Sequence, residues 1–316
     1  MNRIVGIYDL ARSGGSLGTL LILLEELEIQ RQIHSAGKAD LIFVTDAERL
    51  IFGSSSQAAG APGATGIAPL TEVAGAMAGI AQCHDLRGEA ARDETMSLVG
   101  NGCVPWPDPE HLVQGTHSYD STAAIQAFFS QAGAIPRLSV HSELLTWAQS
   151  YLRKRSEGRL PVAVHLKNNP KVTGQSNANL ASWMTLFSCE RSRQAHFFLL
   201  CDDAIDAEFR SLSNVTIASD DSLHLKDYLA LIQAAPLFMG MMSGPANMAL
   251  FGENPYLIFK NPDHHAAEMA LELGDADCYP FALANQRVLR IWDTPENLIG
   301  AFEAATHRME AWPCRN

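Results

Sequence analysis

The sequence predicts an α/β protein with two doubly wound, Rossmann-like domains. Strand-like and helix-like segments alternate along the chain, which favours mostly parallel sheets. The 316 residues are long for one domain and comfortable for two, and 47% are hydrophobic, enough for two cores. A break near residues 156–160 separates two sets of strand–helix units. We therefore expect domains at 1–157 and 158–316, and the last helix can pack back on the first.

The first half opens with a strand over Ile4–Tyr8, a loop over Ser13–Gly18, a helix over Leu20–Gln32 and a strand over Leu41–Val44. Residues 53–82 are rich in small residues and fit either a loosely packed excursion or small-residue helices. The run Val104–Pro109 has three prolines in six residues and is expected to exclude regular structure.

A helix over Ser142–Arg155 closes the first half, with basic residues in its last turn, where they suit the helix dipole. The second half is expected to contain strands at 161–166, 196–201, 214–217, 237–240 and 256–260. Helices are expected near 179–191, 203–211, 224–234 and 245–251, and a last amphipathic helix at 296–309.

Composition narrows the class of protein. A net charge of −12 argues against nucleic acid as a partner. The six cysteines form no C-x-x-C pair, so neither a zinc knuckle nor a redox motif is expected. With no signal-peptide pattern and no membrane-length apolar run, a cytoplasmic location is expected. The basic residues 153–155 allow a peripheral contact with an anionic inner-membrane surface.

The stretch 235–255 carries the strongest functional signal. A short apolar strand ends at Gly240, a small-residue turn follows at Ser243-Gly244, and a helix opens at Pro245. Free N–H groups of such a turn, with the positive end of a helix dipole behind them, bind anions. The expected ligand is a phosphate.

Two more loops follow expected strands, and ligands of doubly wound sheets bind beyond the carboxyl ends of the strands. Lys167, directly after a buried strand, can supply a point charge for a phosphate. Amide side chains nearby can donate to and accept from a sugar or nucleotide; they belong to Asn168, Asn169, Asn177 and Asn179. The second loop contains Gly14, Gly15 and Ser16.

The stretch 235–260 resembles the donor-binding domain of GT-B-fold glycosyltransferases, especially heptosyltransferase-like enzymes of bacterial surface polysaccharide assembly. The features that carry the resemblance are a strand, the Ser243-Gly244-Pro245 turn, a small helix, a Gly-x-x-Pro pattern and the next strand. The resemblance covers mainly residues 160–262 and about the first 30 residues. It implies a GT-B-like fold, with two Rossmann-like domains that face a cleft. It also implies transfer of a sugar from a nucleotide-diphosphate donor to an unknown glycan or lipid-linked acceptor.

The resemblance also implies roles for individual residues. Ser243, Gly244, Pro245 and Asn247 match the diphosphate turn, Lys167 matches a phosphate contact, and Asn168, Asn169 and Asn177 would orient the donor. The Gly14-Gly15-Ser16 loop resembles the acceptor-side loop. Thr19 stands where the family has an aspartate that is the candidate general base, so Asp9 is the nearest replacement. No metal and no cofactor are expected besides the nucleotide sugar.

Each signal also has a structural interpretation. The turns, the asparagines and Asp9 can serve as ordinary turn and cap chemistry. His264-His265, taken as neighbours on one helix, would point apart and are not expected to share a metal. Asp275-Ala-Asp277 is expected to be a loop without a metal, although it matches the D-x-D pattern.

Three other functions stay open. A sugar-nucleotide epimerase would share the fold. A non-catalytic nucleotide- or sugar-binding protein would keep the site without the base. A nicotinamide-dependent enzyme would use the Gly14–Gly18 loop, although this loop lacks the first glycine of the dinucleotide fingerprint.

Overall fold

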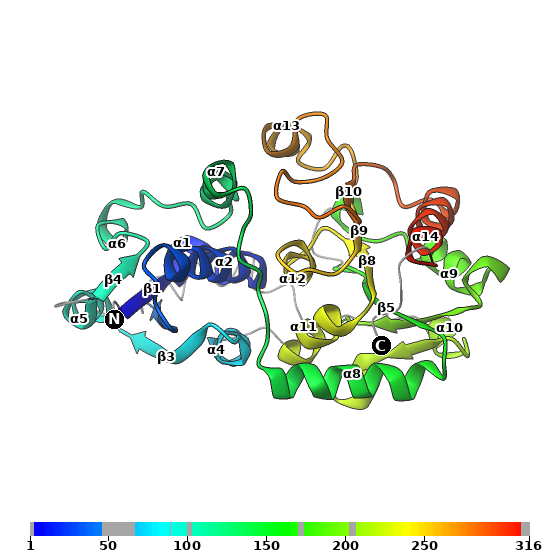
Figure 1. Ribbon diagram of the computed structural model, residues 1–316, viewed down its shortest axis with the longest axis horizontal. Coiled ribbons are helices and arrows are strands. Elements are labelled where there is room, and N and C mark those ends of the chain that lie inside the picture. The colour runs from blue at the N-terminus through cyan, green and yellow to red at the C-terminus, as the bar shows by residue number, and fades with distance from the viewer. Residues whose placement is uncertain are drawn as a thin grey trace. The chain divides into compact units, whose positions relative to one another are not determined.

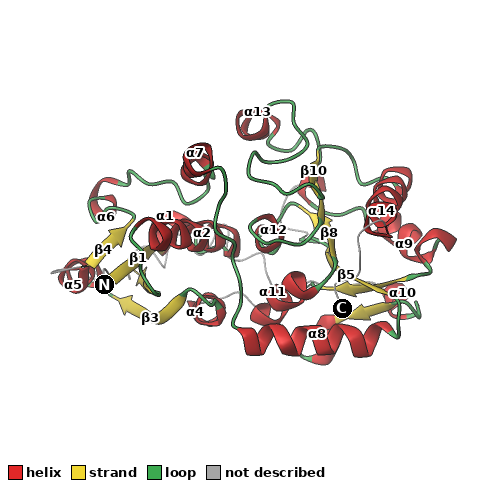
Figure 2. Ribbon diagram, viewed as in Figure 1, coloured by secondary structure: helices red, strands yellow, loops and turns green. Residues whose placement is uncertain are grey.

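The computed structural model describes residues 3–45, 67–88, 90–99, 103–169, 174–201 and 207–310 (Figure 1). The chain divides into two compact units, residues 1–145 with 225–230, and residues 146–224 with 231–316. Helices and strands alternate in both units (Figure 2). The expected boundary after residue 157 and the packing of the last helix on the first domain stay predictions.

The first unit has a four-stranded parallel sheet in the order β3-β2-β1-β4. Its strands are β1 (Arg3–Asp9), β2 (Ala39–Thr45), β3 (Ile80–Arg87) and β4 (Cys103–Trp106). Its helices are α1 (Leu10–Ser13), α2 (Leu17–Ile33), α4 (Ile67–Ala76), α5 (Ala91–Val99), α6 (His111–Gln114) and α7 (Ala123–Ala132), and α8 (Ser142–Ser156) leads out of the unit. β1 and β2 are apolar and almost wholly buried, which is why the sequence predicts them.

The expectation that Val104–Pro109 excludes regular structure is wrong at its start. β4 contains Val104, Pro105 and Trp106 and pairs with β1. β4 lies at the edge of the sheet, where a proline is tolerated because one side of the strand needs no partner. In the small-residue region, 53–66 lies outside the described residues, while α4 and the start of β3 follow it.

The second unit has a six-stranded parallel sheet in the order β10-β9-β8-β5-β6-β7. Its strands are β5 (Leu160–His165), β6 (Ala195–Leu199), β7 (Val215–Ile217), β8 (Leu237–Met241), β9 (Tyr256–Phe259) and β10 (Gln286–Leu289). Its helices are α9 (Leu180–Ser188), α10 (Ala207–Arg210), α12 (Ala246–Leu250), α13 (Ala266–Leu273), α14 (Pro295–Glu310) and the end of α11 (Leu225–Ala234). The strand order reverses between β5 and β8, so a doubly wound sheet would bind its ligand there.

One core holds the second sheet in place. α14 packs against α9, and both cover one face of the sheet (Figure 1). Trp183 and Phe187 of α9 and Phe302 of α14 are buried against sheet residues such as Phe259 and Phe197. Burying each large apolar side chain contributes about 2–3 kcal/mol, so the strand ends rest on a rigid base.

The expected α/β class with two parallel sheets is confirmed. The facing of the two sheets across a cleft stays a prediction. Among the helices that the structure describes, none is both long enough and apolar enough to cross a bilayer.

Candidate functional site

The centre of the candidate site lies where β5 and β8 end side by side. His165, the last residue of β5, pairs with Gly240 of β8. A Cβ on Gly240 would lie 2.5 Å from the His165 carbonyl oxygen, so glycine is what lets the two strands approach. Two residues beyond β8, the Ser243 hydroxyl lies 2.9 Å from His165 Nδ1 and donates to the Met241 carbonyl at 3.0 Å.

The Ser243-Gly244 turn is where the sequence predicts free N–H donors. The N–H groups of Ala246 and Asn247 donate back to the carbonyls of Ser243 and Gly244, both at 3.1 Å. The N–H groups of Ser243 and Gly244 themselves have no acceptor among the described residues. However, α12 is only five residues long, so its dipole is weaker than the sequence suggested. An anion here needs side-chain cations as well.

Lys167 begins the loop after β5, and this loop is tied down at both ends. Its carbonyl accepts from Ala178 N–H at 2.7 Å. The Asn177 amide accepts from Asn169 N–H at 3.0 Å and donates to Asn169 O at 2.8 Å. The Asn177 side chain therefore joins the two described ends of this loop, and its expected contact with the donor stays a prediction, like those of Asn168, Asn169 and Asn247. Residues 170–173 of the loop lie outside the described ones.

A buried carboxylate anchors the far end of the same loop. Asn179 is the N-cap of α9, which is the structural role the sequence allowed. One Asp293 oxygen accepts from Asn179 N–H at 2.7 Å and from Trp183 Nε1–H at 2.9 Å. Asp293 lies 114 residues after Asn179, and no local pattern in the sequence marks it as a site residue.

Lys260 is a second cation at this edge. It directly follows β9, the neighbour of β8, and its side-chain nitrogen lies 2.9 Å from His264 Nδ1. No local pattern in the sequence distinguishes Lys260, because a lysine that ends a strand is usually solvated. Its burial is the distinguishing signal, since the residue is only 8% exposed.

The charges of this edge influence one another. Burial lowers the pKa of Lys260, and the Lys167 charge lowers it further. Burial, followed by Lys260, lowers the pKa of His264 to about 4. Burial and then Lys167 lower the pKa of His165 to about 4. Both imidazoles are therefore neutral near pH 7, and the lysines supply the positive charge.

The expectation that His264 and His265 lie on one helix is wrong. His265 precedes α13 with a φ of 56°, and His264 lies before it in a turn. Among the described residues, no group of three or more His, Cys, Asp or Glu side chains could hold a metal ion. Metal independence stays a prediction. Asp275–Asp277 is a loop after α13, as expected.

The Gly14-Gly15-Ser16 loop is a tight connection between α1 and α2. Gly14 and Gly15 have φ values of 69° and 61°, which favour glycine. Ser16 caps α2 by accepting from Thr19 N–H at 3.2 Å. The Thr19 hydroxyl is buried and donates to Ser16 O at 2.9 Å, so it offers no base. The expected acceptor role of the loop stays a prediction.

Asp9 ends β1 and is fully buried. One carboxylate oxygen accepts from Ala11 N–H at 3.0 Å and caps α1, while the other lies 3.2 Å from Arg92 and 3.5 Å from Arg12. These contacts fit the structural interpretation of Asp9. Its role as the base stays a prediction from the resemblance.

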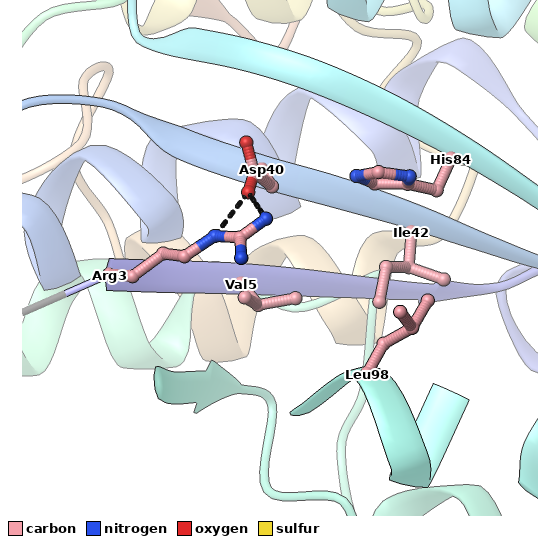
Figure 3. A pocket seen from close by; sticks show the side chains of 6 residues that line it. All are labelled: Arg3, Val5, Asp40, Ile42, His84 and Leu98. Carbon is pink, nitrogen blue, oxygen red and sulfur yellow. Dashed lines mark hydrogen bonds and ion pairs between the residues drawn. The ribbon is translucent and has the colours of Figure 1, made fainter. Parts of the chain in front are cut away.

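A small pocket lies elsewhere in the first unit (Figure 3). Its cavity of about 40 Å³ has room for roughly three water molecules at most. The lining comes from β1, β2, β3 and α5, and Arg3 pairs with Asp40 at its edge; the lining residues are Arg3, Val5, Asp40, Ile42, His84 and Leu98. Arg3 is the first residue of β1, so this pocket does not belong to the carboxyl ends of the strands.

Comparison with known proteins supports the fold. No family model and no curated protein matches the chain. A glycosyl transferase family 9 structure from Veillonella parvula is similar, with a TM-score of 0.58 and 10% identity over 97% of each chain. The E. coli ADP-heptose lps heptosyltransferase II has a TM-score of 0.57 and 11% identity over 98% of this chain and all of its own. The chain therefore has a heptosyltransferase-like glycosyltransferase fold, as the resemblance predicted.

Proposed function

We propose that this protein is a glycosyltransferase that uses a nucleotide-diphosphate sugar. The observation that carries the proposal is that Lys167 and the Ser243-Gly244 turn follow the ends of two neighbouring strands, β5 and β8, where the second sheet reverses its strand order. Two N–H groups that have no acceptor among the described residues, together with a lysine, suit a phosphate. The known structures of this fold include an ADP-heptose transferase, which supports a nucleotide sugar as donor.

The proposed reaction moves a glycosyl group. The acceptor hydroxyl oxygen forms a bond to the anomeric carbon and gives its proton to a base, while the bond from this carbon to the diphosphate breaks. The nucleoside diphosphate leaves with the electron pair. Lys167 and the turn stabilise the negative charge that develops on it. Asn168 and Asn169 orient the donor, and a glycan or lipid-linked acceptor fits the fold relatives in bacterial surface synthesis.

A second function is favoured by the state of Asp9. Its carboxylate caps a helix and pairs with two arginines, and Thr19 has no basic atom. A protein with the donor site and without this base would bind nucleotide sugars and transfer nothing. The two functions share the donor site and differ in turnover.

The proposal is tested by thermal shift with UDP, GDP, ADP, CMP and NAD on wild type, Lys167→Ala, Ser243→Trp and the control Lys154→Ala. A ligand that binds the folded state raises its melting temperature. We expect one nucleoside diphosphate to stabilise wild type and Lys154→Ala, and neither site variant. No shift with any diphosphate, or a shift with NAD alone, would overturn the proposal. Sugar transfer across an acceptor panel, against binding without turnover, then separates the two functions.

A further inference from the structure

Lys260 is a buried ammonium that forms no ion pair with a carboxylate among the described residues. It is 8% exposed, and no carboxylate lies within ion-pair distance of it among the residues that the structure describes. A buried charge is costly unless it is paired. Its one hydrogen-bond partner in the described part of the chain is His264, and the carboxylates of Glu268 and Glu272 favour its charge only from beyond ion-pair distance.

The Lys260–His264 contact fixes the direction of the hydrogen bond. An ammonium group only donates, so His264 Nδ1 accepts at 2.9 Å. The neutral imidazole then carries its proton on Nε2. His264 thus holds the end of Lys260 without neutralising its charge, and the ammonium keeps two N–H groups for another acceptor.

The position of Lys260 relates it to the phosphate turn. The strand order is β9-β8-β5, so Lys260 after β9 and Lys167 after β5 begin on opposite sides of the Ser243-Gly244 turn. Met242 N–H donates to Phe259 O at 2.9 Å and ties the start of the turn to the end of β9. Neighbouring strands lie about 4.8 Å apart, so the two lysines begin roughly 10 Å from each other. Each can meet a different phosphate of one diphosphate.

The orientation of the diphosphate follows from the proposed donor role of Asn168 and Asn169. The amides of Asn168 and Asn169 lie on the β5 side and suit a ribose or base. The phosphate farther from the nucleoside then lies on the β9 side. In a donor sugar this phosphate carries the glycosyl group and takes up the negative charge as the bond breaks.

We propose that Lys260 binds the phosphate distal to the nucleoside and that His264 is a positioning residue for Lys260. This inference rests on the proposed donor site. It gives Lys260 a specific role, the selection of nucleoside diphosphates over monophosphates. Lys167 and the turn bind both kinds of nucleotide.

The test is calorimetric binding of ADP, GDP and UDP, each beside its monophosphate, to wild type, Lys260→Met and the exposed-lysine control Lys154→Met. For the nucleotide that binds, we expect Lys260→Met to lower diphosphate affinity about tenfold or more, the range of a charge-assisted hydrogen bond. The monophosphate affinity should change less than about twofold. Lys154→Met should resemble wild type for both ligands.

The outcomes that would refute the role of Lys260 differ from those that would refute the proposed function. An unchanged diphosphate affinity, or equal losses for both ligands, would refute the distal-phosphate role and leave the proposed function standing. If wild type binds none of the diphosphates, the proposed function fails and the inference fails with it.

Two readouts separate ligand binding from a structural role. Ligand-free Lys260→Met should melt at or above the wild-type temperature, because an unpaired buried charge has been replaced by an apolar side chain. A lower melting temperature would show that Lys260 has a structural role and would refute the proposal.

The positioning role of His264 is tested with two variants. His264→Ala should weaken diphosphate binding, whereas His264→Asn, whose amide oxygen can accept from Lys260, should bind the diphosphate nearly as wild type does. Equal effects of both variants would refute the positioning role.

Discussion

Gly240 and His165 pair at the ends of β8 and β5, and a Cβ on Gly240 would lie 2.5 Å from the His165 carbonyl oxygen. The obstacle is backbone, so it cannot rotate away as a side chain could. The same approach brings Ser243 Oγ within 2.9 Å of His165 Nδ1. One glycine thus sets the spacing on which the phosphate turn depends.

Gly240→Ala should therefore destabilise the protein. Overpacking against rigid neighbours costs about 1–3 kcal/mol. Gly300 is the matched control, because it is a helical glycine with open space around its Cβ position, and Gly300→Ala should stabilise by about 0.5–1 kcal/mol. Denaturant unfolding measures both variants. A Gly240→Ala midpoint at or above that of wild type would contradict the close approach.

Asp293→Ala should destabilise the second unit by about 2–4 kcal/mol, because two buried donors lose their acceptor. These are the Asn179 N–H and the Trp183 indole, at 2.7 and 2.9 Å. Asp275→Ala removes an exposed carboxylate and serves as the control. Denaturant unfolding of both variants checks the prediction, and equal midpoints would show that Asp293 does not anchor the loop.

His165 should make stability depend on pH. Its pKa in the folded protein is lowered to about 4 from 6.5, chiefly by burial. Above pH 6.5 His165 is neutral in both the folded and the unfolded protein and does not change the free energy of unfolding. As the pH falls from 6.5 towards 4, only the unfolded chain binds the proton, so stability is lost, by up to about 2 kcal/mol at pH 5.

The measurement compares unfolding free energies at pH 7 and pH 5 for wild type and His165→Asn. Asparagine can still bond Ser243 but does not titrate, so the variant should lose less stability on acidification. The pKa values of His111, His196 and His264 are also lowered to about 4. These three histidines destabilise wild type and the variant equally on acidification, so the difference between the two proteins reports His165. Equal losses in the two proteins would refute the assignment to His165.

The elements predicted from sequence were those with strong local patterns. β1, β2, β8 and β9 are apolar runs, and each lies within one or two residues of its expected bounds. The sequence does not reveal β3, because its apolar residues are separated by polar ones and form no run, or β10, because its four residues carry little pattern. β4 was excluded because edge position, which permits its proline, is not visible in a local stretch of sequence.

The site was predictable to the same extent. The turn at Ser243 and the lysine at the end of β5 follow from local pattern and the rule for strand ends. Lys260 and Asp293 depend on burial and on contacts between distant segments, which one sequence does not reveal. The short length of α12 was also hidden, and it shifts the expected source of positive charge from a helix dipole to lysines.

The role of Asp9 is open to a direct test. Asp9→Asn keeps an N-cap for α1, because asparagine caps helices as well as aspartate does. It removes the charge that faces Arg12 and Arg92, which lie 3.5 and 3.2 Å away. We expect Asp9→Asn to lower the free energy of unfolding by about 1–3 kcal/mol, measured with denaturant. The loss is smaller than for a fully buried ion pair, because both arginines are partly exposed. Asp120→Asn, at an exposed position of the same unit, should change stability little.

Measuring the transfer activity of the same variants shows whether Asp9 acts as a helix cap or as the general base. A general base contributes about 10²–10⁴-fold to the rate, so its loss would abolish turnover at nearly unchanged stability. With a carboxylate committed to a cap and two arginines, we expect the opposite, lower stability with turnover reduced by about tenfold or less after correction for the folded fraction. Nucleotide affinity should equal that of wild type. Full loss of transfer in a stable, nucleotide-binding Asp9→Asn protein would establish Asp9 as the base.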